Sequence, residues 1–421
     1  MGKVSSSNSQ GVHVPKLRFR DGSGKEFPPY CQESVGTLFY HISRRNNEMA
    51  NKNVITNSAE FGLIHQRLFF DKDIAVEGNT EKYYIIEQGD FVYNPRKSTT
   101  APYGPFNCYQ GDEEGIVSPL YTCLKPLHKE FTNYLLWYFR SSAWYSYVYH
   151  NGAQGGARHD RVGMTNELMD GIPVNLPCLE EQEKVSKFLS LIEQRIEKQR
   201  QLVEALKSYK RGALSKLFPK KGETTPEYRF AGFTEPWKQQ KWCETVDMSK
   251  EMVDPRNGIY NSLPHVAPGN IESFTGRLFD NVKTVEQEEL ISGKFHFHAG
   301  DIIYCKINPQ LGKYYFAKFE GLTSADAYVL NAKNGVIQEF LFAILQTKDF
   351  FDYSVSVSKR SGMPKINREE LNAYLFLAPS ELEQEQIGTF LMYLDHLISS
   401  QRSKIDEYER LKAGLLQQLF I

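Results

Sequence analysis

The chain contains two copies of one plan, and this internal repeat constrains its fold more than any other feature. Residues 177–218 align without a gap with residues 379–420 at an offset of 202, and 14 of the 42 positions are identical. Both stretches open with Pro-x-x-x-Glu-Gln-Glu and end in Leu-Phe. A chain with this symmetry is expected to fold as two similar parts rather than around one core.

The repeat continues upstream of these stretches. Gly-Asp-Phe-Val-Tyr at 89–93 resembles Gly-Asp-Ile-Ile-Tyr at 300–304, and PKLRF at 15–19 resembles PEYRF at 226–230. PKKGETTP at 219–226 has the composition of a linker. A length of 421 residues also exceeds what one hydrophobic core usually supports, so two or more domains are expected.

The two aligned stretches have helical periodicity. Their apolar residues recur at steps of three and four, and no proline interrupts either run, which predicts two long helices that pair as an antiparallel coiled coil. Forty helical residues span about 60 Å. Ser380 and Glu383 are spaced for a capping box at the start of the second helix. The residues predicted to pair the helices are Phe188, Ile192, Ile196, Gln199, Val203, Leu206, Phe390, Leu394, Ile398, Gln401, Ile405 and Tyr408.

Polar residues interrupt both predicted seams at equivalent positions, Gln199 with Gln401 and Lys210 with Lys412. A polar residue in a coiled-coil seam can fix register and partner. These side chains could equally lie at the rim and bend outward, and the sequence leaves both interpretations open.

The globular regions are expected to be strand-rich mixtures of helix and strand, so the fold class is α+β. The expected strands lie at 82–86, 91–93, 116–123, 302–307, 314–319 and 327–330. Each region is also expected to contain one helix before its last loop, at about 130–149 and about 338–353.

Two polar loops recur in each half, one after the Gly-Asp strand and one before the long helix. Arg, Lys, Asn and Gln read base edges in DNA, while Ser, Thr and Tyr mostly contact phosphates. Any one loop taken alone is more typical of a solvated turn. The candidate DNA-binding residues are Arg96, Lys97, Ser98, Thr99, Tyr103, Arg158, His159, Arg161, Lys306, Asn308, Gln310, Lys313, Lys359 and Arg360.

The motifs of common enzymes are absent from the sequence. It contains neither a G-x-x-x-x-G-K-[ST] phosphate loop nor a G-x-G-x-x-G after a strand. No C-x-x-C pair occurs among the six cysteines, which we interpret as reduced thiols of a cytoplasmic protein. His296 and His298 alternate in FHFH, which we interpret as a structural pair, so no catalytic or metal-binding residues are predicted.

Two bulk properties concern partners and targeting. The net charge of −1 argues weakly against a lone DNA-binding protein, which is usually basic. No run approaches the ~18 apolar residues of a membrane helix, so no membrane association is expected. Residues 1–14 are Ser-rich and lack the apolar stretch of a signal peptide, and we expect them to be disordered.

The architecture resembles the specificity subunits of type I restriction-modification systems. The resemblance is carried by PCLEEQEKVSKFL, PSELEQEQIGTFL, the two helix ends and the RSGMPKIN loop before the second helix. It implies target-recognition domains at 15–163 and 227–365. It further implies conserved regions with spacer helices at 164–218 and 366–421, joined to the second domain by the linker 219–226. The first half has GGARHDRVGMT where the second has the more family-like KRSGMPKIN, so the first-half loop departs from the family pattern.

The resemblance also implies a role and a set of partners. Each globular domain would read one half of a bipartite double-stranded DNA site, and the paired helices would set the spacing. Two modification subunits with S-adenosylmethionine would methylate adenine, and restriction subunits with ATP and Mg would cleave DNA. The chain itself would be a non-catalytic subunit that binds no cofactor. Two alternatives stay open: an interaction scaffold on coiled-coil stalks that binds no DNA, and an enzyme whose site the sequence does not reveal.

Overall fold

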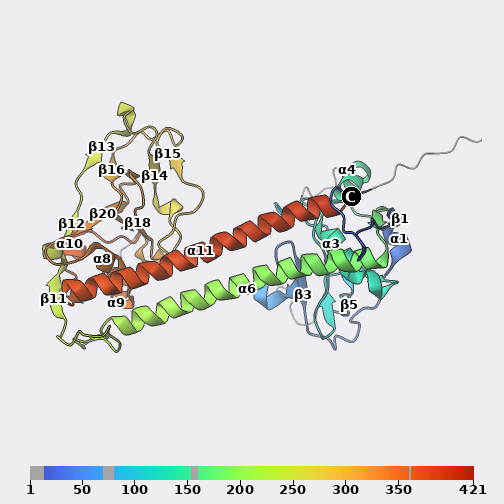
Figure 1. Ribbon diagram of the computed structural model, residues 1–421, viewed down its shortest axis with the longest axis horizontal. Coiled ribbons are helices and arrows are strands. Elements are labelled where there is room, and N and C mark those ends of the chain that lie inside the picture. The colour runs from blue at the N-terminus through green and yellow to red at the C-terminus, as the bar shows by residue number, and fades with distance from the viewer. Residues whose placement is uncertain (1–13, 70–79, 153–159, 360–361) are drawn as a thin grey trace, which may run out of the picture. The chain divides into compact units, whose positions relative to one another are not determined.

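The computed structural model describes residues 14–69, 80–152, 160–359 and 362–421 (Figure 1). The chain divides into two compact units. Unit 1 comprises Met1–Lys198 with Ile405–Ile421, and unit 2 comprises Gln199–Lys404. Both division points fall inside the long helices α6 (Leu179–Leu217) and α11 (Glu381–Leu419), so each unit contains one globular region and part of each helix.

Unit 1 is built around a four-stranded antiparallel sheet in the order β2-β9-β6-β7, with three further strand pairs, β1-β10, β3-β4 and β5-β8. Its strands are β1 (Cys31–Ser34), β2 (Phe39–His41), β3 (Ile55–Ser58), β4 (Gly62–His65), β5 (Tyr84–Ile86), β6 (Phe91–Tyr93), β7 (Phe106–Cys108), β8 (Gly115–Val117), β9 (Thr122–Pro126) and β10 (Pro173–Leu176). Its shorter helices are α1 (Val35–Leu38), α2 (Gln66–Phe69), α3 (Thr132–Arg140), α4 (Tyr145–Asn151) and α5 (Asn166–Asp170), with a 3-10 turn at Lys129–Phe131.

Unit 2 repeats this plan with a four-stranded sheet β12-β20-β17-β18 and the pair β11-β21, and adds a five-stranded sheet β13-β16-β19-β14-β15. Its strands are β11 (Lys238–Lys241), β12 (Val246–Met248), β13 (Met252–Val253), β14 (Pro264–Val266), β15 (Lys283–Thr284), β16 (Lys294–Phe297), β17 (Ile302–Cys305), β18 (Tyr314–Phe316), β19 (Gly321–Thr323), β20 (Ala327–Ala332) and β21 (Leu375–Ala378). Its shorter helices are α7 (Trp242–Thr245), α8 (Gln338–Ile344), α9 (Lys348–Val357) and α10 (Arg368–Asn372), with 3-10 turns at Pro255–Asn257, Pro268–Asn270 and Pro309–Leu311.

Each globular region carries a hydrophobic core that includes the end of a long helix. In unit 1 the core contains Phe91, Tyr134 and Trp144, and Phe420 after α11 packs on Tyr134 at 5.4 Å between ring centroids. In unit 2 the ring of Phe218, after α6, stacks on Phe340 at 5.4 Å. Burial of these aromatic rings, at about 25 cal/mol per Å², fastens the helix ends to the globular regions.

A repeated motif fastens the start of each globular region to the start of a long helix. In unit 1 the Arg18 guanidinium binds both oxygens of the fully buried Glu181 carboxylate, at 3.0 and 2.5 Å. The ring of Phe19 contacts that of Phe188 edge to face at 5.6 Å.

Unit 2 makes the same contacts at the equivalent positions. Arg229 binds Glu383 at 2.9 and 2.6 Å, and Phe230 meets Phe390 at 5.9 Å. The Glu383 carboxylate, expected to form a capping box with Ser380, instead binds Arg229. The PKLRF and PEYRF segments therefore serve as clamps on the helix starts.

Three of the expected elements are each divided into two in the structure. The strand expected at 116–123 is two strands, β8 and β9, because the chain turns where Tyr121 N donates to Ser118 O across Pro119. The helix expected at about 130–149 breaks after Arg140, since Ser141 adopts an extended conformation. The helix expected at about 338–353 breaks between Ile344 and Lys348, where the Thr347 hydroxyl caps α9.

Candidate nucleic-acid interface

The two polar loops predicted in each half are joined by backbone hydrogen bonds. In unit 1, Lys97 N donates to Asp160 O and Val162 N donates to Pro95 O, both at 2.8 Å. Arg96 and Arg161 face each other in an isolated antiparallel bridge. The loop after β6 and the loop before α5 thus form one continuous surface.

Unit 2 contains the same pattern at matching positions. Asn308 N donates to Pro364 O at 2.8 Å, and Ile366 N donates to Lys306 O at 2.9 Å. The bridge between Ile307 and Lys365 completes it. Three of the predicted residues, Arg158, His159 and Arg360, lie outside the described residues.

The unit 1 surface presents mainly exposed polar side chains. Arg96, Lys97, Ser98 and Thr99 are exposed, and Arg96 Nε lies 3.8 Å from Asp160 Oδ2. Such a long, solvated ion pair leaves the guanidinium available to another anion. The Ser98 hydroxyl accepts from Ala101 N and so shapes the turn.

The two remaining unit 1 candidates are half-buried. The ring of Tyr103 packs against Tyr145 at 5.0 Å, which leaves it a partly structural role. Arg161 Nε is buried and has no hydrogen-bond partner within the described residues. A buried donor without a partner lowers stability, so Arg161 is a candidate to donate a hydrogen bond to an acceptor on a bound molecule.

The unit 2 surface gathers cations around one aromatic ring. The Lys306 ammonium and the Arg368 guanidinium each lie 5.5 Å from the centroid of the Tyr328 ring. Burial lowers the pKa of Lys306, and the positive charges of Lys365 and Arg368 lower it further, while Asp326 opposes them.

The other unit 2 candidates differ in exposure and in the hydrogen bonds that their side chains already make. Asn308 adopts a left-handed backbone with φ of 48°, and its amide oxygen accepts from the exposed Gln310 at 3.3 Å. Lys359 is exposed. Lys313, in contrast, donates to Pro268 O at 2.6 Å, so its ammonium already holds a backbone carbonyl.

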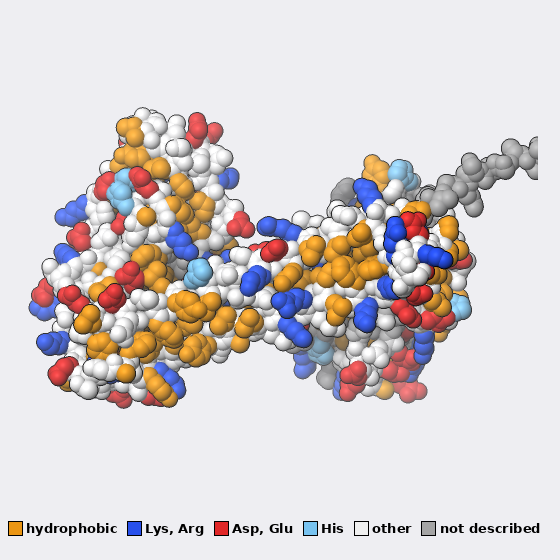
Figure 2. All heavy atoms as spheres, in the orientation of Figure 1, with side chains coloured by type: hydrophobic (Ala, Val, Ile, Leu, Met, Phe, Trp, Pro, Cys, Tyr) orange, Lys and Arg blue, Asp and Glu red, His pale blue; other side chains and the backbone are white. Residues whose placement is uncertain are grey.

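The sequence did not single out Lys365 and Arg368 as candidate DNA-binding residues, although both lie near enough to Lys306 for their charges to lower its pKa. Lys365 lies in the RSGMPKIN loop that the sequence had singled out, so its position was a usable signal. Arg368 opens α10 and reaches Tyr328 only through folding. Figure 2 shows Lys and Arg interspersed with Asp and Glu on the face drawn, in keeping with the net charge of −1.

Polar seam residues of the long helices contact the other helix within each unit. In unit 2, Gln199 Nε2 donates to Gln401 Oε1 at 2.6 Å, and Lys210 Nζ lies 2.5 Å from Asp395 Oδ1. In unit 1, Lys412 Nζ lies 2.7 Å from Glu193 Oε2.

The other predicted pairing residues fall into three groups. Ile196, Val203, Leu394 and Ile398 are buried. Ile192, Leu206, Ile405 and Tyr408 are half-buried. Phe188 and Phe390, as described above, pack on the clamp segments.

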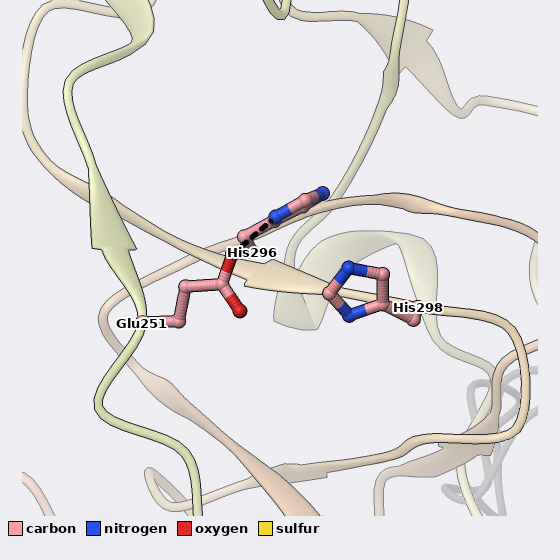
Figure 3. Close-up of side chains that lie close together, drawn as sticks. All are labelled: Glu251, His296 and His298. Atoms are coloured by element: carbon pink, nitrogen blue, oxygen red, sulfur yellow. Dashed lines mark hydrogen bonds and ion pairs between the residues drawn. The ribbon is translucent and has the colours of Figure 1, made fainter.

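One group of side chains within the described residues could hold a metal ion: Glu251, His296 and His298 (Figure 3). His296 Nδ1 lies 2.6 Å from Glu251 Oε1, and Nε2 lies 2.8 Å from Glu320 Oε1. Burial opposes the charge on His296, but the hydrogen bonds to Glu251 and Glu320 outweigh it and raise the pKa of the imidazole.

Known proteins similar to this chain are specificity subunits of type I restriction enzymes. A type I restriction modification DNA specificity domain matches residues 252–410. The chain is 28% identical over 330 residues to the type I restriction enzyme EcoDI specificity subunit of Escherichia coli, an alignment that covers 72% of this chain and 68% of that protein. This chain is therefore similar to type I specificity subunits over most of its length, and the domain match lies in its second half.

Two solved structures resemble this chain in fold. The type I restriction-modification system S subunit from M. genitalium matches with a TM-score of 0.55 at 12% identity, covering 97% of this chain and 99% of that one. A chain from a structural study of complex assembly and conformational transition of the type I R-M system matches with a TM-score of 0.54 at 16% identity, covering 94% and 98%.

Two further observations concern membrane spans and cysteines. Within residues 14–69, 80–152, 160–359 and 362–421, no helix combines the length and the apolar content needed to cross a bilayer. All six cysteines are free thiols.

Proposed function

We propose that this chain is the DNA-sequence-specificity subunit of a type I restriction-modification complex, and that each globular region reads one half of a bipartite site. The observation that carries the proposal is the paired-loop surface, which the same two backbone hydrogen bonds build in both units. In a family of DNA-specificity proteins, a surface duplicated at this level of detail fits a site made of two parts.

The residue types on the two surfaces suit complementary tasks. The exposed cations Arg96, Lys97 and Lys359 are suited to phosphate oxygens, and arginine also to guanine. The amides of Asn308 and Gln310 are suited to base edges, with about 1–3 kcal/mol of discrimination for a good bidentate pair.

We further propose that the two globular regions are tandem target-recognition domains and that α6 and α11 pair as an antiparallel coiled coil that sets the half-site spacing. The contacts in unit 2 support this arrangement, because Gln199 bonds Gln401 while Lys210, further along α6, bonds Asp395, earlier on α11. A helix of 39 residues is about 58 Å long, enough to act as a rigid spacer. The polar pairs fix its register in this proposal.

The chain acts in this proposal as a non-catalytic subunit. Two modification subunits carry S-adenosylmethionine and methylate adenine in each half-site, and restriction subunits with ATP and Mg cleave DNA. Partners that share the phosphate contacts explain how a chain of net charge −1 serves as a DNA reader.

The first test is to map adenine methylation across the host genome with the gene intact, deleted and restored. Loss of one gapped motif on deletion, and its return on complementation, is the expected result. An unchanged pattern, with the modification subunits shown to be expressed and active, would contradict the proposal and favour a scaffold without DNA affinity. Turnover by the isolated chain would instead favour an enzyme.

Matched variants of the two surfaces then test the assignment of half-sites. Arg96→Ala with Lys97→Ala alters unit 1, and Gln310→Ala with Lys359→Ala alters unit 2. Each pair is expected to relax the methylated motif in one half only, and to lower the dependence of DNA affinity on salt by roughly one unit of slope per lysine or arginine removed. Equal effects of both pairs on both halves would rule out separate reading.

A further inference from the structure

A corner of the five-stranded sheet in unit 2 brings together side chains that the proposed DNA reading does not use. Glu251 precedes β13, His296 lies in β16, His298 follows β16 and Glu320 precedes β19. His296 N donates to Glu251 O at 3.0 Å, and β16 pairs with β19 through His296 and Leu322. Backbone hydrogen bonds therefore position the segments that bear these side chains.

The geometry has the form of a metal site with an outer layer of carboxylates. One ligand atom from each of Glu251, His296 and His298 lies within 4.8 Å of the others, and the two imidazole centroids are 4.4 Å apart (Figure 3). A metal-binding histidine commonly gives its second ring nitrogen to a carboxylate. His296 Nε2 lies 2.8 Å from Glu320, and His298 Nδ1 lies 3.8 Å from Asp301.

The matching corner of unit 1 has an arginine, Arg44, where unit 2 has Glu251. Ile85 N donates to Arg44 O at 3.0 Å, as His296 N does to Glu251 O, so Arg44 occupies the place of Glu251. Glu87 N donates to the carboxylate of the aspartate three residues on, as His298 N does, so Glu87 occupies the place of His298.

In unit 1 an arginine side chain pairs with both carboxylates at this corner. The Arg44 guanidinium lies 3.1 Å from Glu87 and 2.6 Å from Glu114, which precedes β8 as Glu320 precedes β19. Unit 2 has a glutamate where that guanidinium stands. The carboxylates of Glu251 and Glu320 there lie against the His296 imidazole instead, at 2.6 and 2.8 Å.

We propose that unit 2 binds one divalent transition-metal ion of the zinc type at this corner, through a carboxylate oxygen of Glu251, Nδ1 of His296 and Nε2 of His298. Two imidazoles and one carboxylate form a donor set that suits Zn²⁺, with a fourth position left for water. Glu251 and His298 are exposed, so their side chains can adjust by rotation to bond lengths near 2.0–2.2 Å. The ion takes the place of the proton that joins His296 to Glu251, and it ties β13 to β16.

The sequence alone favoured a structural histidine pair because Glu251 lies 45 residues before His296. Only the pairing of β13 with β16 brings the third ligand to the pair. The inference is independent of the proposed DNA reading, since none of its ligands belongs to the paired-loop surfaces.

The test uses the full-length chain after a chelator has removed bound metal. Binding of Zn²⁺ is measured by calorimetry during titration with ZnCl₂. Binding of Co²⁺ is measured by the absorption of tetrahedral Co²⁺ during titration with CoCl₂. His298→Ala removes one exposed ligand and is expected to lower Zn²⁺ affinity at least about tenfold. Glu320→Gln is expected to lower it about 10–100-fold by removing an outer carboxylate. His128→Ala is the matched control, because His128 is an exposed histidine 3.5 Å from Glu130 in unit 1, and it is expected to leave affinity unchanged.

Two results would overturn the proposal. One is that the wild-type chain and His298→Ala bind Zn²⁺ with the same affinity and stoichiometry. The other is that His128→Ala lowers affinity as much as His298→Ala does, which would indicate adventitious surface binding. In either case His296 serves only as a positively charged bridge between Glu251 and Glu320. Circular dichroism of each variant shows that it remains folded.

Discussion

The two units agree in the contacts that fasten the globular regions to the helices and differ in what they present to solvent. Leu17 N donates to Gln418 O in unit 1 and Tyr228 N to Lys216 O in unit 2, both at 3.0 Å. At the sheet corner, by contrast, Arg44 in unit 1 is matched by Glu251 in unit 2. The two units thus share the contacts between globular region and long helix, while equivalent exposed positions differ in charge and chemistry.

The strongest way to break this comparison is to remove the buried clamp from each unit in turn. Arg18→Ala and Arg229→Ala each leave a carboxylate, that of Glu181 or Glu383, buried without its cation. Breaking a buried ion pair from one side costs about 3–5 kcal/mol, and both variants are expected to lower the free energy of unfolding by that amount. Urea unfolding followed by circular dichroism measures it.

A surface ion pair in the same segment supplies the control for the clamp variants. Arg20 pairs with Glu26 at 3.3 Å, and both side chains are exposed, so Arg20→Ala is expected to change stability by less than about 1 kcal/mol. A large loss for Arg18→Ala with none for Arg229→Ala would show that the two clamps are alike in geometry but not in energy.

The clamps also show what the sequence could and could not predict. The repeat and the two long helices were predictable to within two residues, because unbroken apolar periodicity depends only on local spacing. The similarity of PKLRF to PEYRF was visible as well. Its role was not, because the contact of Arg18 with Glu181 joins positions 163 residues apart.

The candidate interface was predictable in the same partial way. Both loops of each half could be chosen from their residue types, but their pairing through Asn308 and Pro364 depends on tertiary structure. The breaks after Arg140 and Ile344 were missed because the apolar pattern continues across them. At these two breaks the Ser141 hydroxyl donates to Tyr138 O, and the Thr347 hydroxyl accepts from Phe350 N. Such local side-chain hydrogen bonds compete with helix continuation.

A second way to sharpen the comparison uses the equivalent lysines of the long helices. Lys210 is 9% exposed and binds Asp395, whereas Lys412 is 23% exposed and binds Glu193. Lys210→Met is expected to cost about 2 kcal/mol, because it leaves a largely buried carboxylate without its cation. Lys412→Met is expected to cost less than about 1 kcal/mol, because its partner can turn to water.

The double variant Lys210→Met with Asp395→Leu separates loss of the pair from loss of packing. Replacement of both members by apolar residues is often neutral, so thermal unfolding is expected to recover most of the loss. Failure to recover would show that the pair also fixes helix register, as a polar seam residue can.

A third comparison, confined to the range between pH 4 and pH 7, concerns the aspartates of the two Gly-Asp turns. Burial raises the pKa of Asp90 in unit 1 to about 6. Between about pH 4 and pH 6 the folded chain then binds more protons at this carboxyl than the unfolded chain does, so stability falls as pH rises through this window. Asp90→Asn keeps an acceptor for Glu87 N and removes the charge. Its stability is expected to match the wild type near pH 4 and to exceed it by up to about 2 kcal/mol at pH 7.

Asp301→Asn is the matched substitution in unit 2 for this pH series. Asp301 accepts the equivalent backbone hydrogen bond from His298, but its side chain is 14% exposed and its carboxylate lies 3.8 Å from the His298 ring. Asp301→Asn keeps an acceptor for His298 N at a more exposed position than that of Asp90, so no comparable gain in stability is expected at pH 7. Urea unfolding of both variants at pH 4, 5, 6 and 7 makes the measurement. Equal gains at both positions would mean that the two turns share one electrostatic environment, and the divergence of charge would then be confined to the sheet corner.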